Sequence, residues 1–118
     1  MAPLVLVVDD DPEVLHTLRE VLESAGYRTL GATSFEDGRH LLADTPPPAM
    51  LVTDVRLGIY NGLQLAVLRP AITGLIVISG FVDPTLDAET RRLGGVYMLK
   101  PVSAKVLLET IARMVELA

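Results

Sequence analysis

Short runs of aliphatic residues alternate along the chain with longer segments in which apolar residues recur at helical spacing. The runs have the length of strands and the segments have the period of amphipathic helices, and this alternation is typical of βαβ units. The pattern predicts strands at 4–8, 27–32, 50–53, 75–79 and 96–99. The predicted helices run from Pro12 to Ala25, around Phe35–Leu42, over about 62–69 and 85–93, and from a Ser103 cap to Ala118.

The first run, Leu4–Val8, is aliphatic at every position. A strand without polar positions is covered on both faces, as a central strand of a parallel sheet is. We therefore predict an α/β fold, a doubly wound (βα)5 unit with a five-stranded parallel sheet. The prolines at 46–48 form a stiff loop that is too short to separate domains, so residues 1–118 are expected to form one domain.

The first strand runs directly into three aspartates, Asp9, Asp10 and Asp11. Asp11 has a structural explanation, because an Asp N-cap followed by Pro12 and then Glu13 is a typical helix start. Asp9 and Asp10 have no such explanation. Neighbouring carboxylates repel one another unless a cation lies against them. From this stretch alone, a metal site and a solvated loop both remain open.

Polar residues also follow three later strands, namely Asp54, Ser79 with Gly80, and Lys100 with Pro101. Sheets of this kind bind ligands at the carboxyl ends of their strands, so we expect these groups to share one edge with the first two aspartates. Taken singly, Lys100 is typical of a solvated charge, Ser79–Gly80 of an ordinary turn, and Asp54 of a partner for a loop amide. Their combination at four strand ends favours a site.

The combination of side chains predicts phosphoryl chemistry. Three carboxylates can hold an incomplete octahedral Mg²⁺ that keeps positions open for water and a phosphate. A lysine and a hydroxyl supply the further contacts that a phosphoryl group needs while charge develops on its oxygens. Because a carboxylate can itself be the nucleophile and form an aspartyl phosphate, Asp54 is the candidate nucleophile.

Composition limits the other classes of function. The hydrophobic fraction is 50% with a mean hydropathy of +0.43, yet no apolar run approaches the roughly 18 residues that span a bilayer. No basic segment precedes the first apolar run as it would in a secretory signal, so we expect a cytoplasmic protein without a membrane partner. The net charge of −5 opposes direct binding of nucleic acid by this domain.

Cysteine and histidine add little to this picture. The chain has no cysteine, which excludes disulfides and thiolate metal sites. His16 and His40 fall on polar positions of their predicted helices, so we expect both at the surface rather than as metal ligands.

Taken in order, the strand-end motifs resemble the CheY-like receiver domain of two-component response regulators, over the whole chain. The matching stretches are VLVVDDDP in the first strand, VTDVR around Asp54, Asn61-Gly62, ISG in the fourth strand, and Tyr97 followed by LKP. Each stretch is weak evidence alone, and their order is specific. The resemblance implies a flavodoxin-like sheet with strand order 2-1-3-4-5.

The resemblance also implies a chemical role, namely Mg²⁺-dependent phosphoryl transfer from a histidine kinase or phosphotransfer protein to Asp54. By the family pattern, Asp9, Asp10 and Asp54 would hold the metal together with the backbone carbonyl of Arg56. The domain would act as a signalling phosphoacceptor rather than as an enzyme on an external substrate.

Three further residues would respond to the phosphoryl group in this family. Lys100 would contact it, the Ser79 hydroxyl would swing toward it, and the Tyr97 ring would turn inward as the hydroxyl moves. Ignoring the family, Tyr97 is equally well explained as a half-buried strand aromatic. The phosphorylated form would change the surface carried by the fourth helix, fifth strand and fifth helix.

Some positions depart from the family pattern. Leu57-Gly58 stands where Met-Pro is usual, and Gly58 is expected to leave the metal loop looser. The interval between Asp54 and Ser79 is short, which predicts a third helix clipped by Pro70. Ser79 replaces the commoner threonine and keeps the hydroxyl.

The sequence also allows other interpretations. Arg56 is hypothesised to influence how water reaches an acyl phosphate. The alternative function is a pseudo-receiver, an interaction module acting without phosphorylation. A haloacid-dehalogenase-type phosphatase fits poorly, because Arg56 stands where that family has a second Asp. The sequence leaves open whether an output domain, a target protein or a second copy in a homodimer receives the signal.

Overall fold

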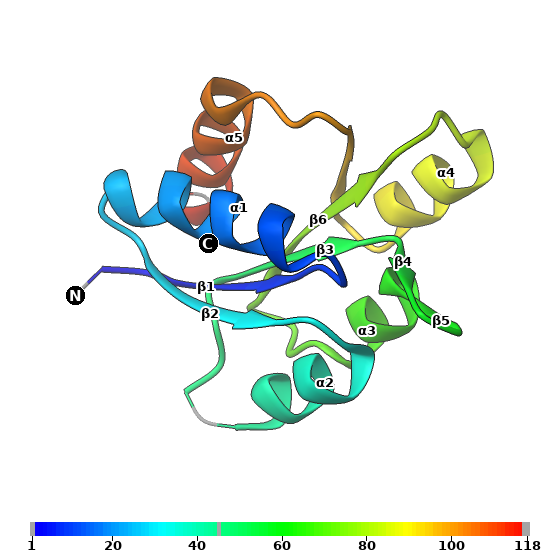
Figure 1. Cartoon of the computed structure of the whole chain (residues 1–118), viewed down its shortest axis with the longest axis horizontal. Helices are drawn as coiled ribbons and strands as arrows, with labels where there is room; N and C mark the ends of the chain where they lie inside the picture. The colour runs from blue at the N-terminus through cyan, green and yellow to red at the C-terminus, as the bar shows by residue number, and fades with distance from the viewer. Residues whose placement is uncertain (1, 45, 117–118) are drawn as a thin grey trace.

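The molecule is built around one parallel sheet (Figure 1), in a computed structural model that describes residues 2–44 and 46–116. The sheet strands are β1 (Leu4–Val8), β2 (Arg28–Ala32), β3 (Met50–Asp54), β6 (Gly74–Ser79) and β7 (Val96–Leu99). They lie in the order β2-β1-β3-β6-β7, and every pairing is parallel. Counting these five strands alone, the order is the predicted 2-1-3-4-5, which confirms the doubly wound fold.

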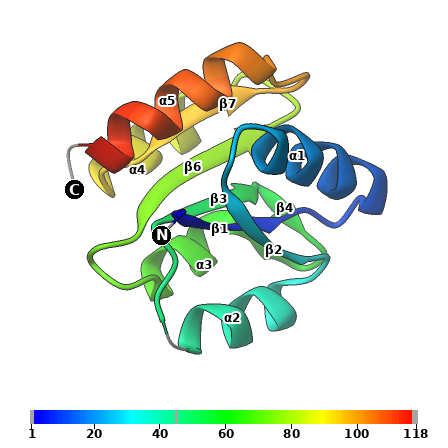
Figure 2. The ribbon, with the colours of Figure 1, turned by 90° about the vertical axis from the view of Figure 1, so that its left-hand side faces the viewer.

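Five helices cover the two faces of this sheet. They are α1 (Pro12–Ser24), α2 (Phe35–Ala43), α3 (Gly62–Leu68), α4 (Pro84–Arg92) and α5 (Ala104–Glu116). Figure 2 shows α1 and α5 on one side of the sheet and α2 and α3 on the other. Among the described residues, no helix is long and apolar enough to cross a membrane.

The aliphatic strands supply two separate apolar clusters, one on each face. Alternate residues of β1 divide between them, with Val5 and Val7 packing on the α1 and α5 side and Leu6 and Val8 on the other. All five residues of β3 are buried. Because both faces are covered, the strands need no polar positions along their length, and the polar residues are left for the strand ends.

The predicted helix starts are largely confirmed. The Asp11 carboxylate accepts a hydrogen bond of 2.9 Å from Glu13 N and caps α1. At α5 the Ser103 hydroxyl accepts from Val106 N at 3.3 Å. The predicted end of that helix at Ala118 lies outside the described residues.

Several boundaries differ from the prediction by one or two residues. Helix α3 ends at Leu68 rather than 69, because the residue before Pro70 is driven out of helical geometry. Helix α4 begins at Pro84, one residue early, because Asp83 caps it and proline suits the first helical position. Strand β2 begins at 28 rather than 27, and β6 begins at 74 rather than 75.

A small hairpin follows β3 that the sequence did not predict. Its strands are β4 (Arg56–Leu57) and β5 (Tyr60–Asn61), which pair antiparallel. Gly58 has a φ of 65° at the turn, a value that glycine adopts without steric cost. Gly58 therefore belongs to the turn of a paired hairpin, and the looser loop expected at this position stays a prediction.

Candidate functional site

Three aspartates meet at the carboxyl edge of the sheet. Asp9 and Asp10 follow β1 and Asp54 ends β3, the strand paired beside it. One carboxylate oxygen from each lies within 4.8 Å of the others. Asp9 and Asp54 are buried, with exposed fractions of 1% and 7%, whereas Asp10 is exposed. The edge therefore has the carboxylate cluster that the sequence predicted.

Lys100 lies against the two buried carboxylates. Its Nζ is 3.2 Å from Asp9 Oδ2 and 3.3 Å from Asp54 Oδ2. The Lys100 backbone amide donates to Ser79 O at 2.8 Å, which holds the end of β7 beside β6. The peptide bond from Lys100 to Pro101 is cis. One ammonium group thus pairs with two of the three clustered carboxylates.

The two carboxylate oxygens of Asp9 differ in their hydrogen bonding. Its Oδ1 accepts from Asp11 N at 2.9 Å, which closes the turn into α1. Its Oδ2 is buried and, among the described residues, has no hydrogen-bond partner, although it is in ion-pair range of Lys100. A buried oxygen in this state is available to a further positive ligand.

Burial and charge act on Asp54 in opposite directions. Burial first, and then the Asp9 carboxylate, raise the pKa of Asp54 above its ordinary value, while Lys100 and the backbone amide of Arg56 lower it. Burial alone would lower the pKa of Lys100, but the Asp9 and Asp54 carboxylates outweigh burial and raise it. Lys100 therefore stays protonated, but its charge is too small to offset the effects of burial and of the Asp9 carboxylate on Asp54.

The donor set fits a hard divalent cation. Mg²⁺ binds oxygen ligands at about 2.1 Å, which places ligand atoms in one octahedron about 3–4 Å apart. The three carboxylate oxygens, within 4.8 Å of one another, need to close by only a small amount. Asp9 Oδ2 accepts no hydrogen bond among the described residues, and Lys100 is the one cation in ion-pair range of it there, so the cluster can accept a further positive charge.

Ser79 and Tyr97 share one hydrogen-bond acceptor. The Ser79 hydroxyl donates to Phe81 O at 3.0 Å, and the Tyr97 hydroxyl donates to the same oxygen at 2.9 Å. The Ser79 oxygen also accepts from Phe81 N at 3.3 Å. Sequence reasoning missed Phe81, because a backbone carbonyl leaves no mark on the side-chain pattern.

A cavity of about 210 Å³ joins most of the predicted residues. It is lined by Asp10, Asp54, Val55, Arg56, Ser79, Gly80, Phe81 and Lys100. The Arg56 guanidinium lies 4.6 Å from the centre of the Phe81 ring, at the wall of this cavity. Asp9 is not among the residues that line the cavity, but it pairs with Lys100, which is. The Tyr97 hydroxyl is connected to the cavity by its hydrogen bond to the Phe81 carbonyl.

The loop after Asp54 is fixed by the start of α3. Asn61 and Gln64 form a reciprocal capping box there, and Gly62 N donates to Val55 O at 2.8 Å. A Cβ on Gly62 would collide with the Asp54 backbone carbonyl oxygen and lie 2.9 Å from Thr53 Cγ2. The Asn61-Gly62 pair therefore holds the backbone of the candidate nucleophile.

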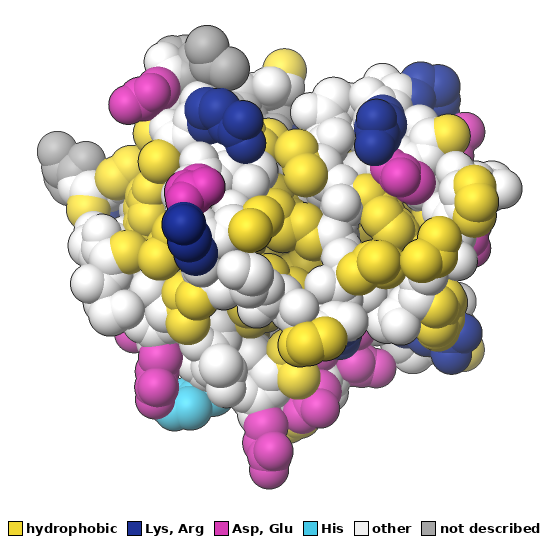
Figure 3. Space-filling model, turned by 90° about the horizontal axis from the view of Figure 1, so that it is seen from above, with side chains coloured by type: hydrophobic (Ala, Val, Ile, Leu, Met, Phe, Trp, Pro, Cys, Tyr) yellow, Lys and Arg dark blue, Asp and Glu magenta, His cyan; other side chains and the backbone are white. Residues whose placement is uncertain are grey.

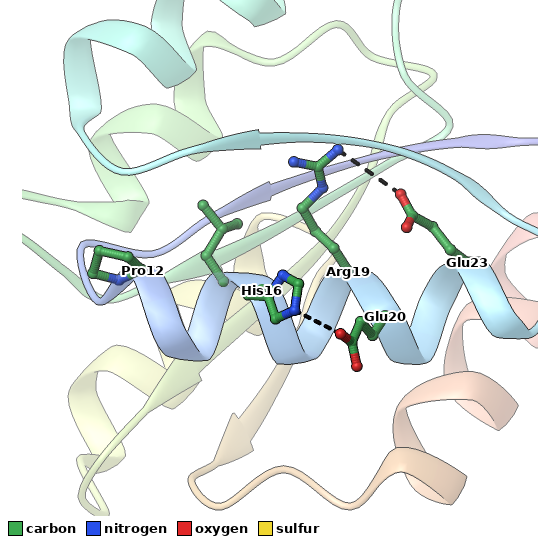
Figure 4. Close-up of a pocket in the computed structure, with 6 residues that line it drawn as sticks. Pro12, His16, Arg19, Glu20 and Glu23 are labelled. Atoms are coloured by element: carbon green, nitrogen blue, oxygen red, sulfur yellow. Dashed lines mark ion pairs between the residues drawn. The ribbon is translucent and has the colours of Figure 1, made fainter.

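A second hollow, of about 320 Å³, lies along the outer face of α1 (Figure 4). Its polar side chains are already paired along the helix, His16 with Glu20 at 2.6 Å and Arg19 with Glu23 at 3.8 Å. His40 is also exposed, so both histidines lie at the surface as predicted. This hollow has no aspartate cluster and is a weaker candidate.

Known proteins resemble the chain over most of its length. The family model described as response regulator receiver domain matches residues 5–112. The two-component response regulator PprB of Pseudomonas aeruginosa is 31% identical over 93% of this chain and 42% of its own length. Protein PilH of the same organism is 32% identical over 91% of this chain and 93% of its own length.

Solved structures agree with this match. A CheY-like response regulator receiver domain protein from Methanospirillum hungatei has a TM-score of 0.89 and 25% identity, with coverage of 98% of this chain and 95% of that chain. The receiver domain of DrrB, solved in a BeF3-activated form, has a TM-score of 0.86 and 26% identity, with coverage of 98% and 99%.

The relatives differ in how much of their length this chain spans. It covers about two-fifths of PprB and a quarter of the transcriptional regulatory protein DctD, but nearly all of PilH. By sequence, family model and fold, the chain belongs to the response regulator receiver domains of two-component signalling.

Proposed function

We propose that Asp54 is a phosphoacceptor and that its phosphorylation requires Mg²⁺. The observation that carries the proposal is the placing of the Asp54 carboxylate, which lies between two further aspartates and Lys100 and lines a cavity shared with Ser79. A nucleophile, a set of hard oxygen ligands and a phosphate-binding cation are then within one edge of the sheet.

The proposed reaction forms one bond and breaks one. An Asp54 carboxylate oxygen attacks the phosphorus of a phosphohistidine, the phosphorus–nitrogen bond breaks, and its electron pair returns to the imidazole nitrogen. The product is an acyl phosphate on Asp54 and a free histidine on the donor. Lys100, now 3.3 Å from Asp54 Oδ2, would pair with an oxygen of the transferred group.

The proposed metal ligands are Asp9, Asp10 and Asp54, with the backbone carbonyl of Arg56 as the fourth. When bound there, Mg²⁺ would supply positive charge for the phosphoryl oxygens and for the buried carboxylates. Asp9 would contribute the oxygen that has no hydrogen-bond partner.

The proposed switch uses the shared carbonyl of Phe81. If the Ser79 hydroxyl turns toward a phosphoryl group, it gives up its 3.0 Å bond to Phe81 O, and the loop before α4 loses one tie. The Tyr97 hydroxyl, which now bonds the same oxygen and links the loop to β7, would leave it as the Tyr97 ring turns inward. Phosphorylation would then shift the population of the surface formed by α4, β7 and α5.

The proposed donor is a histidine kinase or a phosphotransfer protein. A target protein, an output domain or a second copy of the chain would then read the changed surface. The partial coverage of PprB and DctD and the near-complete coverage of PilH are each compatible with one of these arrangements.

The test is intact mass spectrometry after incubation with acetyl phosphate, with and without Mg²⁺. We expect the wild type to gain one phosphoryl group only with Mg²⁺, and Asp54→Ala to gain none. Asp44→Ala, which removes an exposed carboxylate away from the edge, serves as the matched control and should behave as wild type. No gain in the folded wild type would contradict the proposal and favour the pseudo-receiver, whose support is the short α3.

A further inference from the structure

One guanidinium ties three separate backbone segments together at the end of the sheet opposite the aspartates. Arg69 Nε donates to Thr73 O at 2.8 Å, Nη1 donates to Ala66 O at 2.9 Å, and Nη2 donates to Leu93 O at 2.6 Å. Ala66 is in the last turn of α3 and Leu93 is the C-cap of α4. Arg69 therefore joins the C-terminal ends of two helices to the loop before β6.

The positive charge of Arg69 is favourable at the C-terminal ends of these two helices. The last carbonyls of a helix lack partners within the helix and have a partial negative charge, so a cation there is favourable. Burial lowers the pKa of Arg69. Among the described residues, no carboxylate lies within ion-pair range of it, so the two helix ends supply its negative partners.

Arg69 reaches these carbonyls because α3 ends early, just before Pro70. The residue before a proline is driven toward extended geometry, and Arg69 has φ −70° and ψ 149°. Its backbone leaves the helix at this point, and its side chain crosses to a carbonyl 24 residues further along the chain. The short interval between Asp54 and Ser79 thus has a structural consequence at the far edge of the sheet.

Helix α4 has few other attachments. Within it only Thr90 is buried, while Leu86 and the C-cap Leu93 pack partly on the core. Charged side chains gather on its outer face, at the upper right of Figure 3. The carbonyls of residues 89–91 accept hydrogen bonds from the backbone amides of Leu93, Gly94 and Gly95. The bond to Leu93 O is therefore a tie between α4 and another element.

We propose that Arg69 is a latch that fixes the C-terminal end of α4 to α3, so that α4 can move only at its N-terminal end. The opposite end of α4 follows the Phe81 loop, which two hydroxyl groups hold. Helix α4 thus has one attachment before its N-terminal end, which depends on hydroxyl groups, and one at its C-terminal end, which depends on the Arg69 guanidinium. In the proposed function, on which this second step rests, phosphorylation releases the first attachment and α4 pivots about the second.

The latch itself is tested by hydrogen exchange on the unphosphorylated protein. Arg69→Met keeps an apolar stem of similar length and removes the donors, and we expect exchange of the amides at 91–95 to accelerate about tenfold, the effect of losing one hydrogen bond to a charged group. Arg69→Lys keeps the charge without the planar fork and should accelerate exchange by a smaller factor. Arg92→Met is the matched control, since Arg92 is exposed and bonds only to Glu89, and should leave these amides unchanged.

Two results would overturn the latch. One is wild-type exchange at 91–95 in both Arg69 variants, and the other is an equal acceleration in β1 and β3, which would mean a general loss of stability. If Arg69→Met does not fold, Arg69→Lys decides between these outcomes.

A second measurement tests the pivot after acetyl phosphate treatment. We expect the wild type to change exchange only at 81–88 and Arg69→Met to change it through residue 95. A change in hydrogen exchange throughout α4 in the wild type would overturn the proposed pivot. Failure of Asp54 to accept a phosphoryl group would contradict the proposed function. It would leave the latch unaffected, because the latch is tested by hydrogen exchange on the unphosphorylated protein.

Discussion

Asp54 is held in a place that disfavours its charge, and this has a measurable consequence. Burial, and next the Asp9 carboxylate, raise the pKa of Asp54 above 3.8, so ionising it costs more in the folded chain than in the unfolded one. Below both pKa values the carboxyl is neutral in each state and the cost is absent. The cost grows as pH rises from about 4 and is complete above the folded pKa.

Without Mg²⁺, Asp54→Asn should therefore raise the free energy of unfolding at neutral pH, by roughly 1 kcal/mol, the order of a coupling between neighbouring groups. The gain should shrink as the pH is lowered toward about 4. Urea unfolding with a chelator present, over this pH range, measures it. Asp44→Asn, at an exposed carboxylate, is the control, and a gain that is equal at all pH values would refute the electrostatic explanation.

Arg56 gives a second prediction for a single residue. Its guanidinium lies over the Phe81 ring at the wall of the cavity that holds Asp54. We propose that it would obstruct one approach of water to an acyl phosphate there. Arg56→Ala should shorten the phosphoryl half-life about two- to fivefold, the factor that corresponds to a cation–π contact of about 0.5–1 kcal/mol. Decay of the phosphorylated mass after donor removal gives the half-life. The exposed Arg39→Ala should decay as wild type, and equal half-lives for Arg56→Ala and wild type would sink the idea.

Among the elements, the start of α3 is the one most constrained by the site. Gly62 is the first residue of this helix, and helix interiors prefer alanine to glycine by about 1 kcal/mol. A Cβ there would instead meet the backbone carbonyl of Asp54, which cannot move without displacing the end of β3. Packing therefore decides against the intrinsic helix preference at this position.

Gly62→Ala should lower the free energy of unfolding by about 1–3 kcal/mol, as overpacking does, and should slow phosphorylation of Asp54 because it displaces the nucleophile's backbone. Urea midpoints and acetyl phosphate mass gain measure the two effects. Gly80→Ala is the control for stability, because its added Cβ meets no atom within 4 Å. A Gly62→Ala protein as stable as wild type would contradict this account of the Asn61-Gly62 pair.

The elements also differ in how well the sequence predicts them. Long aliphatic runs such as Leu4–Val8 have a pattern that only a covered strand explains, and they were found within one or two residues. The hairpin at 56–61 was not, because strands of two residues are too short to have a period. The Arg69 bonds escaped prediction because they join a side chain to backbone carbonyls, one of them 24 residues away.

For the whole molecule, the topology explains why the site residues could be anticipated. Parallel strands with covered faces bring their carboxyl ends to one edge, so residues as far apart in the sequence as Asp9 and Lys100 converge there. The sequence predicted that Asp9, Asp10, Asp54, Ser79 and Lys100 lie together at this edge, and the structure has them there. It did not predict the Phe81 carbonyl that links Ser79 to Tyr97, which depends on the path of one loop.

The most direct test of the central claim is to locate the phosphoryl group. Treating the phosphorylated protein with borohydride reduces an acyl phosphate to an alcohol, and peptide mass spectrometry then identifies the altered residue. We predict homoserine at position 54, present only when Mg²⁺ and acetyl phosphate were both supplied. Homoserine at Asp9 or Asp10 instead, or phosphoryl that survives borohydride on another side chain, would contradict the account.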